Sequence, residues 1–374
     1  MTTTMMILRL ACAWVSVAAF LLFGDTLLGQ LGAPLPSLLL FLWLLGIIVW
    51  ASFGVVHEAE ELAERLGEPY GTLILTLSIV IIEVALVGAV MLGAQGAPTL
   101  GRDTMFAVLM IVLNGVVGVG LLIGGLRHFQ QRYNLKGATS YLAVIIPLTV
   151  IPLFLPNFTT STPDGTLTSF QAIAFSIFTV ALYGAFLALQ TGRHSMFFRE
   201  PDEDGKPASA LAAAEDKLAS PSSAGELLPR VGLLLANILP IVILSKSLAK
   251  VLDFGIAKLG APAALGGILI AMVVFTPECI AALRAITANQ LQRAVNLCLG
   301  AAASTLGMTV PAVLLIGVFT GQPVVLGLSG TNMVIAAMTL LLSTLTFTGT
   351  RTTMLEGAVH LAVFFVFLVL VFSP

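Results

Sequence analysis

Residues 71–83 read GTLILTLSIVIIE, and residues 84–92 continue as VALVGAVML. This run is apolar over the length that a helix needs to cross a bilayer, and Glu83 is the acidic residue near its middle. A charged side chain at that depth is costly and is by default a functional candidate. The same arrangement returns at residues 266–278, GGILIAMVVFTPE, where Gly266 precedes Glu278 by the same twelve residues that separate Gly71 from Glu83. The two runs predict two midmembrane carboxylates on two distant helices.

The composition is that of a polytopic membrane protein. Of the 374 residues, 58% are hydrophobic and 10% are charged, and the mean hydropathy is +1.03. A soluble domain carries about 25% charged residues. A net charge of −2 without a basic cluster gives no sign of nucleic-acid binding. The three cysteines lack the spacing of a disulfide framework or a zinc site.

The hydrophobic runs predict an all-α integral membrane protein with about eleven transmembrane helices. The predicted spans are 8–30, 35–55, 70–93, 104–127, 139–157, 168–190, 230–250, 262–286, 292–318, 323–345 and 353–373. With the N-terminus in the cytoplasm, thirteen of the seventeen Lys and Arg residues fall on the inner side. We therefore expect a protein of the cell inner membrane with a cytoplasmic N-terminus and a periplasmic C-terminus.

The spans also predict an internal repeat. Residues 1–33 form an N-terminal transmembrane helix, 34–198 a first five-helix repeat with Glu83, 199–229 an acidic cytoplasmic linker, and 230–374 a second five-helix repeat with Glu278. Equivalent helices are five segments apart. Because each segment reverses the direction in which the chain crosses the membrane, an odd separation means that the two repeats should be inverted relative to each other. Inverted repeats with a midmembrane site are a common architecture of secondary transporters.

Two buried glutamates suit the exchange of a cation for a proton. A carboxylate in a low dielectric favours its neutral form, whereas an adjacent cation favours the charged form. Cation and proton therefore compete for the same oxygens, and a site that opens to one side at a time converts this competition into exchange. Calcium requires about six to eight oxygen ligands. Polar residues in the segments that follow the two glutamates are candidate supporting ligands: Asn114, Ser304 and Thr305.

Parts of the chain resemble the calcium/cation antiporter superfamily. FTPE at 275–278 and the run at 282–315 resemble its second alpha-repeat, and residues 67–87 resemble its first. The likeness is strongest to the ChaA-type calcium–sodium–potassium/proton antiporters of the cation/proton exchanger branch. This resemblance implies eleven helices, alternating access, and Glu83 and Glu278 as shared cation and proton ligands. Vacuolar exchangers carry Gly-Asn before each glutamate, whereas this chain has IVIIE and VFTPE, which adds sodium and potassium to the expected cargo.

The expected function is therefore export of Ca²⁺, and also of Na⁺ or K⁺, in exchange for H⁺. No enzyme activity and no cofactor are expected, and the partners are inorganic cations, protons and the lipid bilayer, with homo-oligomer formation left open. Two alternatives remain. One is a cation channel. The other is a rhomboid-like intramembrane serine protease, in which Ser329 of the GLSG motif at 327–330 pairs with His360.

Overall fold

The computed structural model describes residues 3–66, 70–93, 98–163, 165–201, 224–349 and 351–373. The chain divides into two compact units. The first comprises Met1–Leu100 and Ala219–Pro277, and the second comprises Gly101–Leu218 and Glu278–Pro374. Each unit draws on both predicted repeats, so the units and the repeats divide the chain differently. The repeat boundaries therefore remain a prediction.

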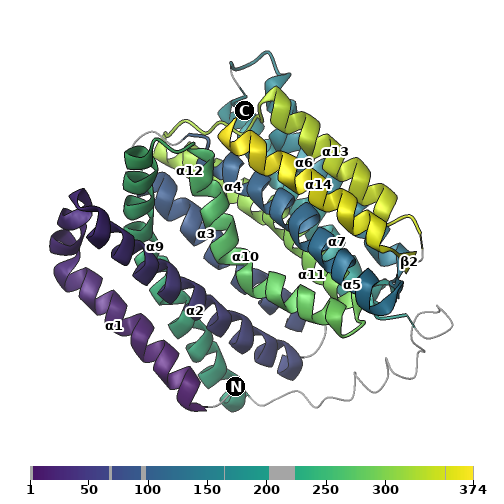
Figure 1. Ribbon diagram of the computed structural model, residues 1–374, viewed down its shortest axis with the longest axis horizontal. Coiled ribbons are helices and arrows are strands. Elements are labelled where there is room, and N and C mark those ends of the chain that lie inside the picture. Colours follow the sequence, from purple (N-terminus) through teal and green to yellow (C-terminus); the bar gives the residue numbers. More distant parts are fainter. Residues whose placement is uncertain are drawn as a thin grey trace. The chain divides into compact units, whose positions relative to one another are not determined.

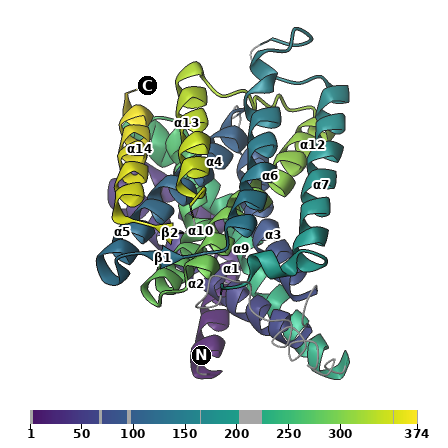
Figure 2. The same cartoon turned by 90° about the vertical axis from the view of Figure 1, so that its right-hand side faces the viewer.

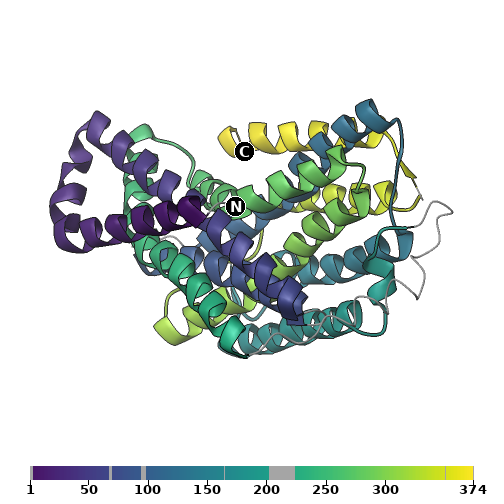
Figure 3. The same cartoon turned by 90° about the horizontal axis from the view of Figure 1, so that it is seen from below.

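The first unit is a helical bundle built around α2 and α9. Its elements are α1 (Thr3–Leu28), η1 (Gly29–Gly32), α2 (Pro34–Leu66), α3 (Tyr70–Gly93), α9 (Ala224–Leu259) and the part of α10 (Ala264–Thr287) that ends at Pro277. Helix α9 packs against α1, α2 and α3, and α2 packs against α1 and α3 (Figure 1). Figure 3 shows α1 and α2 as the purple pair that turns back on itself at η1.

Helix α2 continues well past the predicted end of its span near residue 55. The acidic sequence HEAEELAERL, residues 57–66, forms its last turns. An ion-pair cluster explains this extension, because Arg230 of α9 lies 3.3 Å from the Glu58 carboxylate and 2.8 Å from that of Glu61. Glu58 is fully buried, so the pair with Arg230 compensates part of its desolvation.

The second unit contains most of the remaining helices. They are α4 (Leu100–Leu109), α5 (Val117–His128), α6 (Leu135–Leu153), α7 (Ser169–Thr191), the end of α10, α11 (Leu291–Ser304), α12 (Val310–Thr320), α13 (Gly330–Thr346) and α14 (Met354–Phe372). Shorter elements are η2 (Met110–Val116), β1 (Gln131–Arg132), η3 (Leu155–Asn157), η4 (Ser195–Phe198), η6 (Thr305–Thr309) and β2 (Arg351–Thr352). The principal contacts pair α5 with α14, α7 with α12 and α6 with α11. Figure 2 shows α6, α7, α13 and α14 with their axes roughly parallel in that view.

Local hydrogen bonds fix where several of these helices begin. Thr168 and Gln171 form a capping box at the start of α7, and Thr353 and Glu356 form one at the start of α14. The two-residue strands β1 and β2 pair antiparallel, with Gln131 opposite Thr352. This short ladder ties the connection before α6 to the connection before α14.

The prediction of about eleven membrane helices is confirmed. Within the described residues, nine helices are long and apolar enough to span a membrane, and the shorter apolar stretches Leu77–Ala89 and Gly330–Thr346 complete the set. The helix predicted at 323–345 begins only at Gly330, because the residues before it, 322–329, form no regular secondary structure. The amides of Leu326 and Gly327 donate to the Gly165 carbonyl, and the amide of Leu328 donates to Leu153, so these backbone groups are satisfied without a helix.

Most of the predicted acidic linker, residues 202–223, lies outside the described residues. Its C-terminal end, residues 224–229, is already part of α9. Its N-terminal end is fastened to the second unit. Asn296 of α11 donates to the Phe198 carbonyl at 2.6 Å, and the Glu200 carboxylate accepts from the backbone amides of Gln292 and Arg293. Partial desolvation raises the pKa of Glu200, and these two amide bonds oppose the rise.

Candidate functional site

Glu83 lies on α3 in the first unit and is fully buried. Its neighbours on the helix, Ile82, Leu86 and Val87, are buried as well, and α3 packs against α2 and α9. Most residues of α3 are aliphatic, and Glu83 is the charged residue among those that the helix contains. The buried Ser78 of the same helix donates to the Ile74 carbonyl of the preceding turn. A buried carboxylate without a function would be a net cost to the fold.

Glu278 lies on α10 and is only 7% exposed. It is the first residue of the second unit, and Pro277 is the last of the first. Helix α10 runs through Pro277, which has no amide hydrogen to donate to the preceding turn. The sequence predicted two buried glutamates, and the structure buries both, one in each unit.

Each glutamate is followed, at the same spacing, by a π-helix. The segment η2 begins at residue 110, 27 residues after Glu83, and η6 begins at residue 305, 27 residues after Glu278. Single π-helical turns inside α-helices are rare and occur often at functional sites. The repeated spacing supports the equivalence of the two halves more strongly than their residue identities do.

Asn114 lies in η2 and is fully buried in a polar network. Its Nδ2 donates to Thr339 Oγ1 at 2.8 Å, and its Oδ1 lies 3.1 Å from Nδ1 of His360. Since Oδ1 can only accept, His360 Nδ1 donates this hydrogen bond, and Nε2 of His360 lies 3.0 Å from Thr346 Oγ1. The network fixes the orientation of the Asn114 carboxamide. Within the part of the chain that the structure describes, His360 is the one donor to Oδ1, and a carbonyl oxygen can accept a second bond.

Ser304 and Thr305 lie at the junction of α11 and η6, and both are buried. Ser304 Oγ donates to the Ala301 carbonyl at 3.0 Å. Helix α11 packs against η2, so the structure places the Ser304 helix beside the segment that carries Asn114, within the second unit. These three candidates share a unit with Glu278, whereas Glu83 belongs to the other unit.

Thr309 is a polar residue that sequence reasoning missed. It lies in η6, is fully buried, and its Oγ1 has no hydrogen-bond partner among the described residues. Thr309 follows Glu278 by 31 residues, the same spacing that separates Asn114 from Glu83. This shared spacing of 31 residues is the feature of the sequence that could have identified Thr309 as the counterpart of Asn114. The contact of His360 with Asn114 could not be predicted either, because the two residues are 246 positions apart in the sequence.

The Ser329–His360 dyad of the protease alternative is wrong. Ser329 is exposed and caps the N-terminus of α13, where its side chain accepts from the Asn332 amide. His360 contacts Thr346 at the opposite end of the same helix, and both of its ring nitrogens are engaged. The 17 residues of α13 correspond to about 25 Å, so Ser329 and His360 cannot form a dyad.

Comparison with known proteins identifies the family. The chain matches the sodium/calcium exchanger protein family over residues 36–192 and 230–373. It is 40% identical to the putative ionic transporter y4hA of Sinorhizobium fredii over 342 residues. The matched region covers 91% of this chain and 90% of that protein. It is 37% identical over 341 residues to the sodium-potassium/proton antiporter ChaA of Escherichia coli, with the same coverage.

Solved structures show the same fold. Native YfkE superimposes with a TM-score of 0.69 at 18% identity, covering 98% of this chain and 100% of that one. The H⁺/Ca²⁺ exchanger CAX gives the same TM-score at 15% identity, covering 98% of this chain and 89% of that one.

Proposed function

Because the chain belongs to the sodium/calcium exchanger protein family, we propose that it is a cation/proton antiporter that exports Ca²⁺, Na⁺ or K⁺ in exchange for H⁺ by alternating access. It is a multi-pass membrane protein, and its family is one of transporters. The proposed setting is the cell inner membrane, with the N-terminus in the cytoplasm and the C-terminus in the periplasm.

One observation carries this proposal: two buried glutamates, Glu83 and Glu278, each followed 27 residues later by a π-helix. In this proposal both carboxylates bind the cation when charged and carry protons when neutral. Without a cation, burial favours the protonated forms, and the charge of an entering cation favours their release. Since the same oxygens serve both ions, no covalent step is required.

The supporting oxygens are proposed to come from the two π-helical segments and from Ser304, the last residue of α11 before η6. Asn114, Ser304 and Thr305 are the candidates, and Thr309 joins them through its buried hydroxyl. A π-turn also displaces backbone carbonyls from their usual α-helical partners, and such carbonyls suit a cation that needs more than two carboxylates. The cargo follows from similarity: identity is 37% to ChaA, a sodium-potassium/proton antiporter, and 24% to the Ca²⁺/H⁺ antiporter of Aphanothece halophytica. This order favours Na⁺ and K⁺ as cargo beside Ca²⁺.

Transport by the purified protein in liposomes that contain a pH dye tests the proposal. We expect an imposed proton gradient to collapse when Ca²⁺, Na⁺ or K⁺ is added, and the relative rates rank the cargo. Mg²⁺ serves as the comparison ion. A cation current without proton movement would instead favour a channel, and no response to any of these ions would contradict the proposal.

We expect His360 to act through Asn114, as a positioning residue. In a substitution of His360, the side-chain nitrogen of asparagine lies near the position of the histidine Nδ1, and that of glutamine lies near the position of Nε2. His360→Gln therefore loses the bond to Asn114 and should raise the apparent KM for the cation about five- to thirtyfold, the equivalent of about 1–2 kcal/mol. His360→Asn keeps that bond and should retain a KM near that of the wild type. Equal KM values, with both variants equally destabilised to heat, would assign His360 a purely structural role.

A further inference from the structure

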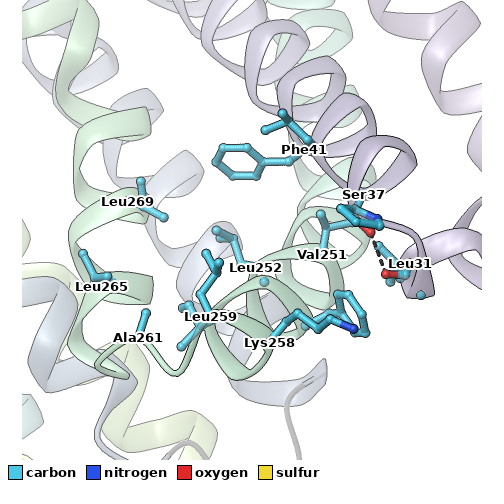
Figure 4. Close-up of a pocket in the computed structure, with 16 residues that line it drawn as sticks. Leu31, Ser37, Phe41, Val251, Leu252, Lys258, Leu259, Ala261, Leu265 and Leu269 are labelled. Carbon is cyan, nitrogen blue, oxygen red and sulfur yellow. Dashed lines mark hydrogen bonds between the residues drawn. The ribbon is translucent and has the colours of Figure 1, made fainter.

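An apolar cleft in the first unit lies between the ends of three helices. Its volume is about 380 Å³, and it is lined by residues of η1, the first turns of α2, the last turns of α9 and the start of α10. Figure 4 shows Ser37 and Phe41 of α2, Leu252 and Leu259 of α9, and Leu269 of α10 facing the cleft. All these segments belong to the same unit.

The lining combines hydrocarbon surface with one positive charge. Sixteen residues line the cleft. Lys258 is charged, Ser37 is polar and neutral, and the other fourteen are apolar. The Ser37 hydroxyl is turned to the carbonyl oxygens of Leu31 and Ala33, at 2.6 and 2.8 Å. Among the described residues Lys258 has no carboxylate partner, and its ammonium lies 5.9 Å from the Phe254 ring. Its charge is therefore available to an anion.

The position of the cleft points to a ligand from the membrane. Helix α9 has 36 residues and is about 54 Å long, more than the roughly 30 Å of the hydrocarbon core, so at least one of its ends extends past the core. Lys258 lies in the last turn, and a charged lysine is costly inside the core, so this end of α9 is the one we assign to the head-group region. Large apolar side chains that line the cleft are also exposed: Leu38 is 53% exposed and Leu259 82%. An apolar lining and an interfacial lysine suit a molecule with a hydrocarbon chain and an anionic head group.

We propose that this cleft binds one acyl chain of an anionic phospholipid, whose phosphate is held by Lys258. The apolar lining of α2, α9 and α10 holds the chain, and the lysine selects the head group by charge. The site is separate from Glu83 and Glu278, and its occupation does not depend on the proposed transport activity.

Lipid binding by the purified full-length chain tests this proposal directly. Phosphatidylglycerol and phosphatidylcholine with identical acyl chains are titrated in native mass spectrometry. The wild type should bind phosphatidylglycerol more tightly. Lys258→Gln should weaken phosphatidylglycerol binding about fivefold and leave phosphatidylcholine binding unchanged. Lys250→Gln is the matched control, since Lys250 is exposed on the same helix but does not line the cleft, and it should behave as the wild type.

A second variant tests the cleft without changing its charge. Ala261 lines the cleft, and Ala261→Phe should fill it and weaken the binding of both lipids. The proposal is overturned if the wild type shows no preference for phosphatidylglycerol, if Lys258→Gln binds that lipid as tightly as the wild type does, or if Ala261→Phe binds both lipids unchanged.

Discussion

Glu83→Gln and Glu278→Gln should each reduce cation-dependent proton exchange to the background of empty liposomes. Glutamine has nearly the same shape as glutamate, so packing around these buried positions is conserved. The glutamine side chain does not take up or release a proton at any pH at which the protein is folded, and it offers a cation no negative charge. Each variant should therefore insert and fold but lose both halves of the exchange cycle.

The matched control is Glu60→Gln, at a partly exposed position on the acidic end of α2. It removes the same charge outside the proposed site and should transport at the wild-type rate. Retained wild-type exchange in either Glu83→Gln or Glu278→Gln would contradict the proposed role of that residue.

Gly357→Ala should strongly destabilise the second unit, because α5 and α14 cross there with their backbones in contact. A β-carbon at Gly357 would lie 2.5 Å from the backbone nitrogen of Leu122 and 2.8 Å from the carbonyl oxygen of Gly118. Neither atom can move away as a flexible side chain could. We expect a loss of about 1–3 kcal/mol or more and a fall of several degrees in the melting temperature of the purified protein.

Gly184→Ala provides the control for helix propensity. Gly184 lies on α7, where a β-carbon would meet no atom within 4 Å. Alanine is the better helix former by about 1 kcal/mol, so this variant should be as stable as the wild type or slightly more stable. Equal melting temperatures for Gly357→Ala and Gly184→Ala would show that the close crossing of α5 and α14 does not limit stability.

Much of the fold could be predicted from the chain because membrane helices follow from the length of apolar runs. Among the described residues, the nine helices of membrane-spanning length and the two shorter apolar stretches agree with the predicted spans. The π-helices η2 and η6 could not be predicted, since an i to i+5 hydrogen bond has no distinct residue pattern. The non-helical residues before Gly330 could not be predicted either. Their alternative partners, Gly165 and Leu153, lie far away in sequence, and hydropathy carries no information about such contacts.

The candidate site was predictable to the extent that a charge in an apolar run is conspicuous. Glu83 and Glu278 were found for that reason, and their burial agrees with the prediction. The surroundings of Asn114 were not predictable, because Thr339 and His360 reach it from 225 and 246 residues away. The roles of Glu83 and Glu278 as cation ligands, and of His360 as a positioning residue, remain proposals that the variants above test.

Competition between cation and proton at the two glutamates is tested most directly by proton release during cation binding. Purified protein in weakly buffered detergent solution is titrated with Ca²⁺, Na⁺ or K⁺ while pH and binding heat are recorded. We predict that binding releases protons, that the apparent affinity rises with pH, and that both effects are lost in Glu83→Gln and Glu278→Gln. Cation binding of unchanged affinity across pH, with no proton released, would contradict a shared site.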